Sequence, residues 1–308
     1  MVNFSPLAAT PSHGSAPRSA RIAARDGVVL ALDHFGPASA PAVVFAHGFG
    51  QTRHAWDESA APLADAGWHC VTADARGHGE SGWLADGNYA YDQLIDDLTL
   101  VARGCACGDV LPVLVGASMG GLLGLSAQAL HAPLFRALVL VDITPRWEAA
   151  GVARILGFMR AHPQGFATFE EAADAIASYL PHRAERKSPG QLRKLLVAGA
   201  DGRLRWHWDP RLLELVERDS ASYQRDLLDA ARSVAVPTLL VSGARSDVVS
   251  AATISEFLEL VPHARHVRIE QATHMVAGDA NTAFARAVAE FIEQLPLPSA
   301  ALSARGSP

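Results

Sequence analysis

The stretch VGASMGGLLGL, residues 115–125, places Ser118 between two glycines, Gly116 and Gly120. An apolar run at 113–115 comes directly before Gly116, and a helix-forming pattern follows the serine. This order predicts a buried strand, a sharp turn and a helix, with the serine at the tip of the turn. Glycines suit these two positions because side chains there would crowd the strand against the helix. Such an arrangement is typical of a nucleophile elbow, the turn that presents an attacking hydroxyl.

The composition is that of a globular protein. The chain has 308 residues, of which 49% are hydrophobic and 19% are charged, which suits one large domain or a domain with an insert. The formal net charge of −6 provides no basic surface for nucleic acid or for a membrane. No apolar stretch approaches the roughly 20 residues of a membrane span. We therefore expect neither nucleic-acid nor membrane partners, and the composition leaves the oligomeric state open.

The two ends of the chain and its cysteines bear on location. Residues 1–19 and 296–308 are rich in Pro, Ser and Ala, and we expect them to be flexible tails. The first of them has no basic start followed by an apolar block, so it does not resemble a secretory signal. Cys70, Cys105 and Cys107 have neither disulfide-framework nor zinc-site spacing. Reduced thiols and a cytoplasmic location are the expectation.

Short apolar runs alternate with helical patterns on both sides of the serine. Two runs, 21–25 and 28–36, flank Asp26-Gly27 and predict a hairpin. Further strands are expected at residues 42–46, 68–74, 110–116, 137–142, 236–243 and 266–270. Strands that alternate with helices pair in parallel and form a sheet that is covered on both faces.

Residues 146–232 interrupt this alternation, because their pattern is helical with no clear strand. A helical block between two parallel strands is expected above the carboxyl edge of the sheet, where ligands bind. We therefore expect an α/β core of residues 20–145 and 233–295, with 146–232 as a cap. Large apolar side chains could form the ceiling of a substrate pocket, although packing of the cap onto the core explains them equally well. These candidates are Trp147, Phe158, Met159, Trp206 and Trp208.

A reactive serine needs a base and an acid, in the chain order Ser, then Asp or Glu, then His. His274 lies between the last predicted strand and the last predicted helix, and therefore at the carboxyl edge. Two acids are candidates: Asp142 ends the strand before the cap, and Asp247 follows strand 236–243. Either could orient the histidine ring. The structural alternative for Asp142 is a strand-end cap that begins the insert.

The oxyanion that forms on attack needs two preorganised donors. We expect one to be the N–H of Met119, directly after the serine, and the other to come from HGFG, residues 47–50. Phe49 is the expected donor there, with its ring lining the pocket, whereas His47 is expected to have a structural role beneath the loop. The sequence shows no metal-ligand spacing and no phosphate-binding glycine loop, so we expect no metal and no cofactor.

Taken in order, these motifs resemble the α/β-hydrolase superfamily over about residues 22–295. The stretch DARGHGESG, residues 74–82, resembles the scaffold turn after the fourth strand of that superfamily. The resemblance implies an α/β-hydrolase fold with a mostly parallel central sheet and an inserted helical cap. It also favours Asp247 as the acid, because the loop at 243–248 resembles the usual acid loop. Ser118 argues against epoxide hydrolases and haloalkane dehalogenases, which use an aspartate nucleophile.

The triad of Ser118, His274 and Asp247 predicts a serine hydrolase of the carboxylesterase type. We expect it to cleave a small ester or related acyl compound through an acyl-enzyme. Lactonases, C–C hydrolases, perhydrolases and acyltransferases of the superfamily use the same triad. A ligand-sensing receptor on this fold is an alternative of another class. The sequence does not name the acyl group or the leaving group.

Overall fold

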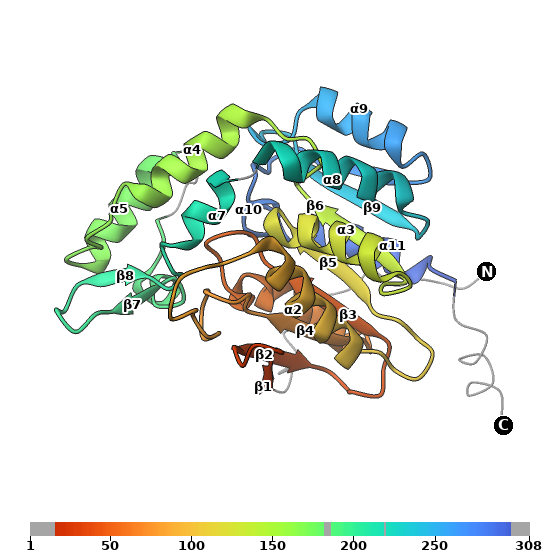
Figure 1. Cartoon of the computed structure of the whole chain (residues 1–308), viewed down its shortest axis with the longest axis horizontal. Coiled ribbons are helices and arrows are strands. Elements are labelled where there is room, and N and C mark those ends of the chain that lie inside the picture. The colour runs from red at the N-terminus through yellow and green to blue at the C-terminus, as the bar shows by residue number, and fades with distance from the viewer. Residues whose placement is uncertain (1–15, 182–185, 219, 297–308) are drawn as a thin grey trace.

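The structure is a computed structural model that describes residues 16–181, 186–218 and 220–296. Its centre is an eight-stranded sheet in the order β1-β2-β4-β3-β5-β6-β9-β10 (Figure 1). The strands are β1 (Arg18–Ala23), β2 (Val29–Phe35), β3 (Ala42–Ala46), β4 (His69–Ala73), β5 (Val113–Ala117), β6 (Ala137–Val141), β9 (Thr238–Gly243) and β10 (Arg265–Ile269). Strand β2 pairs antiparallel with β1 and β4, and the other pairs are parallel. The mostly parallel sheet predicted from the sequence is confirmed.

Helices cover both faces of the sheet. They are α1 (Asp57–Asp65), α2 (Tyr91–Gly104), α3 (Met119–His131), α8 (Ser220–Ser233), α9 (Ala251–Leu260), α10 (Val276–Asp279) and α11 (Asn281–Glu293), with the 3₁₀ helix η1 (Arg53–Trp56) before α1. Side chains of α2, α3, α8 and α9 share one hydrophobic cluster, and those of α1 and α11 share another. Alternate residues of β5 point to opposite faces, so Leu114 lies in the first cluster and Val115 in the second.

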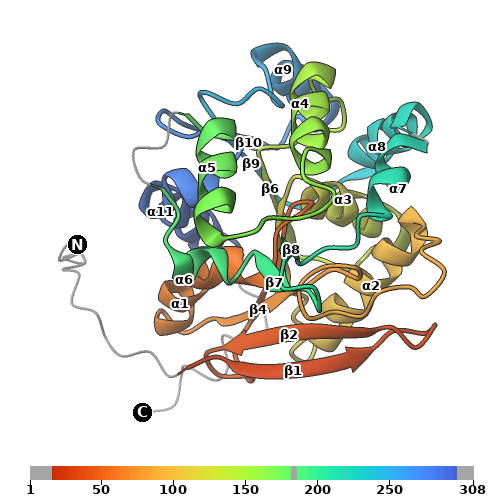
Figure 2. The ribbon, with the colours of Figure 1, turned by 90° about the vertical axis from the view of Figure 1, so that its left-hand side faces the viewer.

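The cap follows β6 and has a small core of its own. It contains α4 (Ala149–Arg160), α5 (Phe169–Tyr179), α6 (Pro189–Leu192), β7 (Leu196–Ala198), β8 (Leu204–Trp206) and α7 (Leu212–Arg218). Figure 2 shows α4, α5 and the β7–β8 hairpin in front of the central sheet. Phe166, Ile176 and Leu192 are buried together in the cap. The hairpin was not expected, since each of its strands has only three residues.

Two predicted boundaries need correction. The region at 146–232 was expected to be cap throughout, but α8 packs on α3, and its Leu227 and Ala231 belong to the main hydrophobic core. Helical periodicity shows that one face is apolar but not which body covers that face. The tail expected at 1–19 also overlaps β1, which begins at Arg18. The remaining tail residues, 1–15 and 297–308, lie outside the described residues.

Candidate active site

Ser118 occupies the turn between β5 and α3 in a strained conformation. Its φ is 46° and its ψ is −116°, a region that residues other than glycine rarely adopt and that is typical of functional sites. The backbone hydrogen bonds of the turn hold it there. The N–H of Ser118 donates to the carbonyl of Val141 at 3.1 Å, and the carbonyl of Ser118 accepts from Gly121 N at 3.0 Å.

The flanking glycines are required by close packing. A Cβ atom added at Gly116 would lie 2.6 Å from the carbonyl oxygen of Gly120. One added at Gly120 would lie 2.3 Å from the carbonyl oxygen of Ala46 in β3. Both distances are well inside van der Waals contact, and the obstacles are backbone atoms that cannot move aside. The spacing G-x-S-x-G therefore allows α3 to approach the sheet directly behind the serine.

Asp142 is the carboxylate that contacts His274. It follows β6 directly, its φ is 49°, and its side chain is fully buried. Its Oδ1 accepts from Gly243 N at 2.7 Å, and its Oδ2 lies 2.8 Å from His274 Nδ1. Since a carboxylate only accepts, Nδ1 carries the proton of the neutral ring, and Nε2 is left as an acceptor for a hydroxyl proton. Ser246 Oγ donates to the same Oδ2 at 2.5 Å.

Asp247, the acid that the sequence favoured, contacts a cap residue instead of His274. The expected contact between Asp247 and His274 is therefore wrong. Asp247 Oδ2 accepts from Nε of Arg154, in cap helix α4, at 2.6 Å. The two candidates follow the adjacent parallel strands β6 and β9, so both start from the same sheet edge. The left-handed conformation of Asp142 turns its side chain across the end of β9 to His274, and this contact excludes Asp247.

The HGFG loop after β3 lies against the serine. A Cβ atom added at Gly48 would be 3.3 Å from the Cβ of Ser118. The Gly48 N–H donates to Gln51 Oε1 at 3.0 Å, so Phe49 provides the next amide of the loop. Met119 is the first residue of α3, where backbone N–H groups have no partner within the helix. Both amides are therefore placed near the serine, and their role as oxyanion donors remains a prediction.

Comparison with known proteins shows the family of the chain. Residues 41–280 match the family model described as the alpha/beta hydrolase fold. The chain belongs to the α/β-hydrolase family. A 3-hydroxybutyrate-oligomer hydrolase of Cupriavidus necator is 32% identical over 253 residues, which are 77% of this chain and 84% of that protein. An esterase of Mycobacterium tuberculosis is 30% identical over 281 residues, 87% of this chain and 86% of its own.

Solved structures give the same result. A crystal structure of E-2-(acetamidomethylene)succinate hydrolase superimposes with a TM-score of 0.77 at 24% identity, covering 90% of this chain and all of that one (100%), which supports the fold. The M. tuberculosis esterase has a TM-score of 0.69 at 26% identity, covering 92% of this chain and 93% of that one. The names of these relatives support assigning this α/β hydrolase to enzymes that act on esters.

Two buried, neutral histidines hold the HGFG loop of this hydrolase. His47 Nε2 accepts from Ala75 N at 3.0 Å, so its Nδ1 donates to the Gly48 carbonyl at 2.8 Å. His78 Nε2 accepts from Gly50 N at 3.2 Å, so its Nδ1 donates to the Arg76 carbonyl at 3.1 Å. Burial lowers the pKa of both rings. The structural role expected for His47 agrees with these bonds, whereas His78 was expected only to be part of a scaffold turn.

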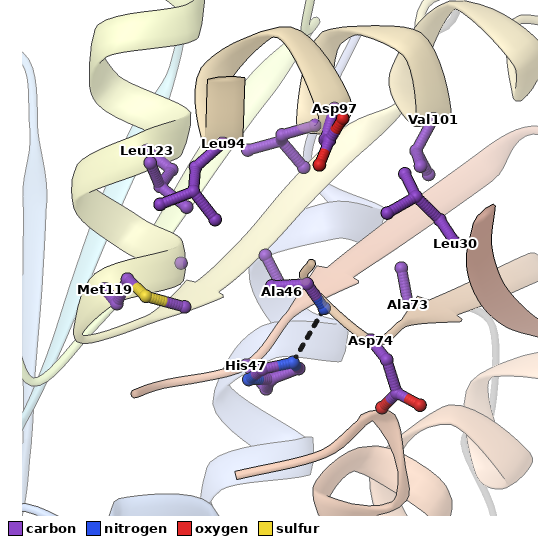
Figure 3. A pocket seen from close by; sticks show the side chains of 13 residues that line it. Leu30, Ala46, His47, Ala73, Asp74, Leu94, Asp97, Val101, Met119 and Leu123 are labelled. Carbon is purple, nitrogen blue, oxygen red and sulfur yellow. Dashed lines mark hydrogen bonds between the residues drawn. The ribbon is translucent and has the colours of Figure 1, made fainter. Parts of the chain in front are cut away.

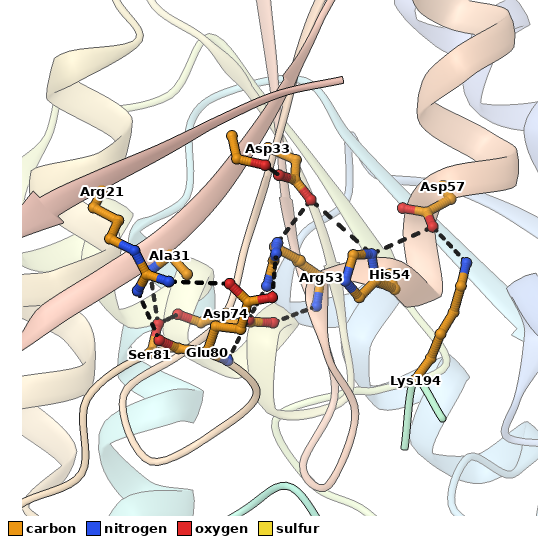
Figure 4. A network of polar contacts seen from close by, with 11 residues as sticks. Arg21, Ala31, Asp33, Arg53, His54, Asp57, Asp74, Glu80, Ser81 and Lys194 are labelled. Carbon is orange, nitrogen blue, oxygen red and sulfur yellow. Dashed lines mark hydrogen bonds and ion pairs between the residues drawn. The ribbon is translucent and has the colours of Figure 1, made fainter. Parts of the chain in front are cut away.

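A network of charged residues fixes the segment after the loop (Figure 4). The buried guanidinium of Arg53, in η1, lies between the carboxylates of Asp33 and Asp74, with Nε 2.7 Å from Asp33 Oδ2. The N–H of Arg53 also donates to Asp74 Oδ1 at 2.7 Å. Removing one partner of a buried pair typically costs about 3–5 kcal/mol. Lys194 of the cap contacts Asp57 at 2.9 Å, and this ion pair links the cap to the same network.

Met159 and Trp208 form the cap surface that covers the HGFG loop. A Cβ atom added at Gly50 would be 2.2 Å from Met159 Cε and 3.7 Å from Trp208 Nε1. The rings of Phe49 and Trp208 are 5.5 Å apart. The other proposed ceiling residues have packing contacts instead. Phe158 stacks on Tyr179, Trp206 packs against Phe166, and Trp147 contacts the main core.

A small cavity lies behind the elbow (Figure 3). Its volume is about 40 Å³, and Met119, Leu123, His47 and Asp97 are among the side chains that line it. A buried water needs about 10–15 Å³ measured in this way, so the cavity has room for no more than a few waters. It is therefore too small for a substrate.

Among the described residues, no group of three or more His, Cys, Asp or Glu side chains has an arrangement that could hold a metal ion. Within the same ranges, no helix combines the length and the hydropathy needed to cross a membrane.

His207 connects the cap to the core, and its burial leads us to expect that stability depends on pH. Its Nδ1 accepts from Gly79 N at 3.1 Å, and burial lowers its pKa to about 4. Below its ordinary pKa of about 6.5, the unfolded chain binds a proton that the folded chain does not bind. We therefore expect the free energy of unfolding to fall as the pH is lowered from about 6.5 to about 4.

The variant His207→Asn tests this expectation, because the Asn Oδ1 can still accept from Gly79 N but does not titrate. Urea unfolding across this pH range should show a shallower loss of stability in His207→Asn than in the wild type. His263→Asn, at an exposed position, serves as the control and should keep the wild-type slope. Equal slopes in all three proteins would contradict the expectation.

Proposed function

We propose that this α/β hydrolase cleaves small carboxylic esters through an acyl-enzyme on Ser118, with His274 as base and Asp142 as the orienting acid. The observation that carries the proposal is the hydrogen bond from His274 Nδ1 to the buried Asp142, beside the strained elbow. Ser118 and Asp142 are neighbours across β5 and β6, since the N–H of Ser118 donates to the carbonyl of Val141.

The HGFG loop, which we call the oxyanion loop, joins the serine and histidine sides of the proposed site. Gly48 lies against Ser118, and Gln51 Nε2 donates to the sulfur of Met275, the residue after His274, at 3.5 Å. These two contacts link Ser118 to the residue next to His274, which supports the proposed grouping. Gln51 and Ser246 were not expected from the sequence, because nothing in the chain order distinguishes a polar residue that positions a neighbour from an ordinary loop residue.

Each step of the proposed reaction uses a group at the site. Ser118 Oγ attacks the ester carbonyl while His274 Nε2 takes its proton, and Asp142 stabilises the imidazolium that forms. The amides of Phe49 and Met119 donate to the oxyanion. When the tetrahedral intermediate collapses, the C–O bond to the alcohol breaks and His274 returns the proton to the alcohol. A water, activated by the same histidine, then releases the acid and regenerates Ser118.

The names of the relatives narrow the ester class. A 3-hydroxybutyrate-oligomer hydrolase and an esterase both match most of this chain. We propose that small esters, including oligomers of short hydroxy acids, are the substrates. Met159 and Trp208 pack closely over the HGFG loop. This close packing supports an acyl group of limited size.

A substrate panel with a trapping step tests this proposal. Nitrophenyl esters of graded acyl length and 3-hydroxybutyrate dimers should be hydrolysed, with the rate falling as the acyl group grows. An alkyl phosphonate should add to the protein once, and peptide mass spectrometry should locate it on Ser118. A protein that binds ester analogues tightly, turns over no member of the panel and takes up no phosphonate would instead be a ligand receptor.

A further inference from the structure

Cap helix α4 is attached to the core at the loop that follows β9. The N–H of Glu148, just before the helix, donates to the carbonyl of Val248 at 2.9 Å. One turn later, Gly151 lies so close to the carbonyl oxygen of Asp247 that an added Cβ atom would be 1.9 Å from it. The beginning of α4 therefore rests directly on the backbone of this loop.

The Asp247 carboxylate fastens the next turn of α4. Nε of Arg154 donates to Asp247 Oδ2 at 2.6 Å, and its Nη1 donates to the carbonyl of Tyr179 at 3.2 Å. The guanidinium carbon lies 4.7 Å from the centre of the Tyr179 ring, in the range of a cation–π contact. Because Tyr179 ends α5, one core carboxylate holds the two principal cap helices through a single arginine.

The same helix carries Met159 to the oxyanion loop. Arg154 and Met159 are five residues apart, or about 7.5 Å along the axis at 1.5 Å per residue. The methyl group of Met159 contacts Gly50 of the HGFG loop. We expect α4 to move as a unit, so that releasing Arg154 would allow Met159 to lift from Gly50.

The loop after β9 also contacts the acid of the proposed triad. Ser246 Oγ donates to Asp142 Oδ2, and it accepts from the N–H groups of Val248 and Val249 at 3.1 Å each. Ser246 therefore faces the site and Asp247 faces the cap. Asp142 thus contacts His274 and Asp247 contacts the cap, although the sequence made both of them candidates for the same catalytic acid.

We propose that Asp247 and Arg154 form a latch that holds α4 over the oxyanion loop and so limits the size of the acyl group accepted. Asp247 is then a positioning residue that acts through Arg154 and Met159, not a catalytic residue. The size limit rests on the proposed ester hydrolysis at Ser118, whereas the latch itself does not. Both side chains are partly exposed, at 48% for Arg154 and 35% for Asp247. Exposed pairs are weak, so a roughly two- to fivefold effect is expected.

The variants Asp247→Asn and Arg154→Gln, singly and together, test the latch. Each single change should raise the ratio of kcat/KM for a bulky ester to that for a short ester about two- to fivefold. The double variant should show no larger effect, because either change breaks the same contact. The kcat for the short ester should stay within about twofold in all three variants. The exchanged pair Asp247→Arg with Arg154→Asp should restore part of the wild-type ratio.

Amide hydrogen exchange provides a measurement that needs no turnover. Peptides from residues 149–160 should exchange faster in both single variants than in the wild type. The control is Arg146→Gln, which breaks the pair of Arg146 with Glu256 at similar exposures of 49% and 34%. This control should leave both the exchange of α4 and the ester ratio unchanged.

Different results would overturn different parts of the proposal. A loss of several orders of magnitude on every ester in Asp247→Asn, with Arg154→Gln harmless, would make Asp247 the catalytic acid and remove the latch. Unchanged exchange in α4 in both single variants would also remove it. If the wild type hydrolysed no ester, the ester function and the size limit would fail together, and faster exchange would still establish the latch.

Discussion

Ser118→Ala is expected to lose about 10⁴- to 10⁶-fold in kcat on esters while the protein stays folded. Ser118 Oγ is the only attacking group in the proposed reaction, and what remains would come from the oxyanion donors and from binding. Nitrophenyl ester hydrolysis, measured together with circular dichroism and thermal unfolding, checks this result. Ser39→Ala, at an exposed position, should retain wild-type activity.

Folding should survive this substitution because alanine keeps the backbone of the elbow. The φ of 46° at residue 118 is set by hydrogen bonds of main-chain atoms, which the substitution does not touch. The flanking glycines, whose packing would be disturbed by a Cβ atom, also remain. A folded Ser118→Ala protein with near wild-type turnover would therefore show that another group attacks the ester.

The elbow could be predicted from the sequence because its constraints are local. Gly116 and Gly120 are needed since each approaches backbone atoms within a few residues or in the adjacent strand. Strand and helix patterns on either side supply the rest of the signal. The same holds for His274, whose place after the last strand puts it at the carboxyl edge.

The choice of acid could not be predicted, because both candidates occupy equivalent places. Asp142 and Asp247 follow adjacent parallel strands at the same edge of the sheet. The choice depends on a backbone angle of 49° at Asp142 and on the cap arginine that takes Asp247. Neither feature has a signature in the chain order. The resemblance of loop 243–248 to a usual acid loop therefore favoured the residue that contacts Arg154 over the one that contacts His274.

The sequence shows an interruption of the strand–helix alternation after β6 but not how its large apolar side chains are used. Its large apolar side chains were equally compatible with a pocket and with packing, and the structure divides them. Phe158 and Trp206 pack within the cap, whereas Met159 and Trp208 cover the HGFG loop. Whether such a side chain packs within the cap or covers the loop depends on which face of its helix or strand meets the core. Periodicity shows that a face is apolar but does not identify what covers it.

Asp142→Asn is expected to lower kcat by about 10³- to 10⁴-fold, and Asp247→Asn by no more than about twofold. The amide of an asparagine can donate to His274 Nδ1, which would leave the proton on Nε2, where the base must accept one. The asparagine also carries no charge to stabilise the imidazolium. The measurement is kcat on a short nitrophenyl ester, at equal folded fraction.

Asparagine is the right substitution because Asp142 also has structural bonds. Its Oδ1 accepts from Gly243 N, and its Oδ2 accepts from Ser246 Oγ. An alanine would leave both donors buried without a partner, whereas an asparagine keeps one acceptor oxygen at the same place. A matched stability in Asp142→Asn and Asp247→Asn would then separate the effect on chemistry from an effect on folding.

The double variant decides between the two carboxylates. If Asp142 is the acid, adding Asp247→Asn to Asp142→Asn should lower kcat further by no more than the small factor seen for Asp247→Asn alone. If Asp247 can replace Asp142 at His274, the single Asp142→Asn variant should keep substantial activity, and only the double variant should lose it. A larger loss in Asp247→Asn than in Asp142→Asn would show that the contact of His274 with Asp142 at 2.8 Å is not the one used in catalysis.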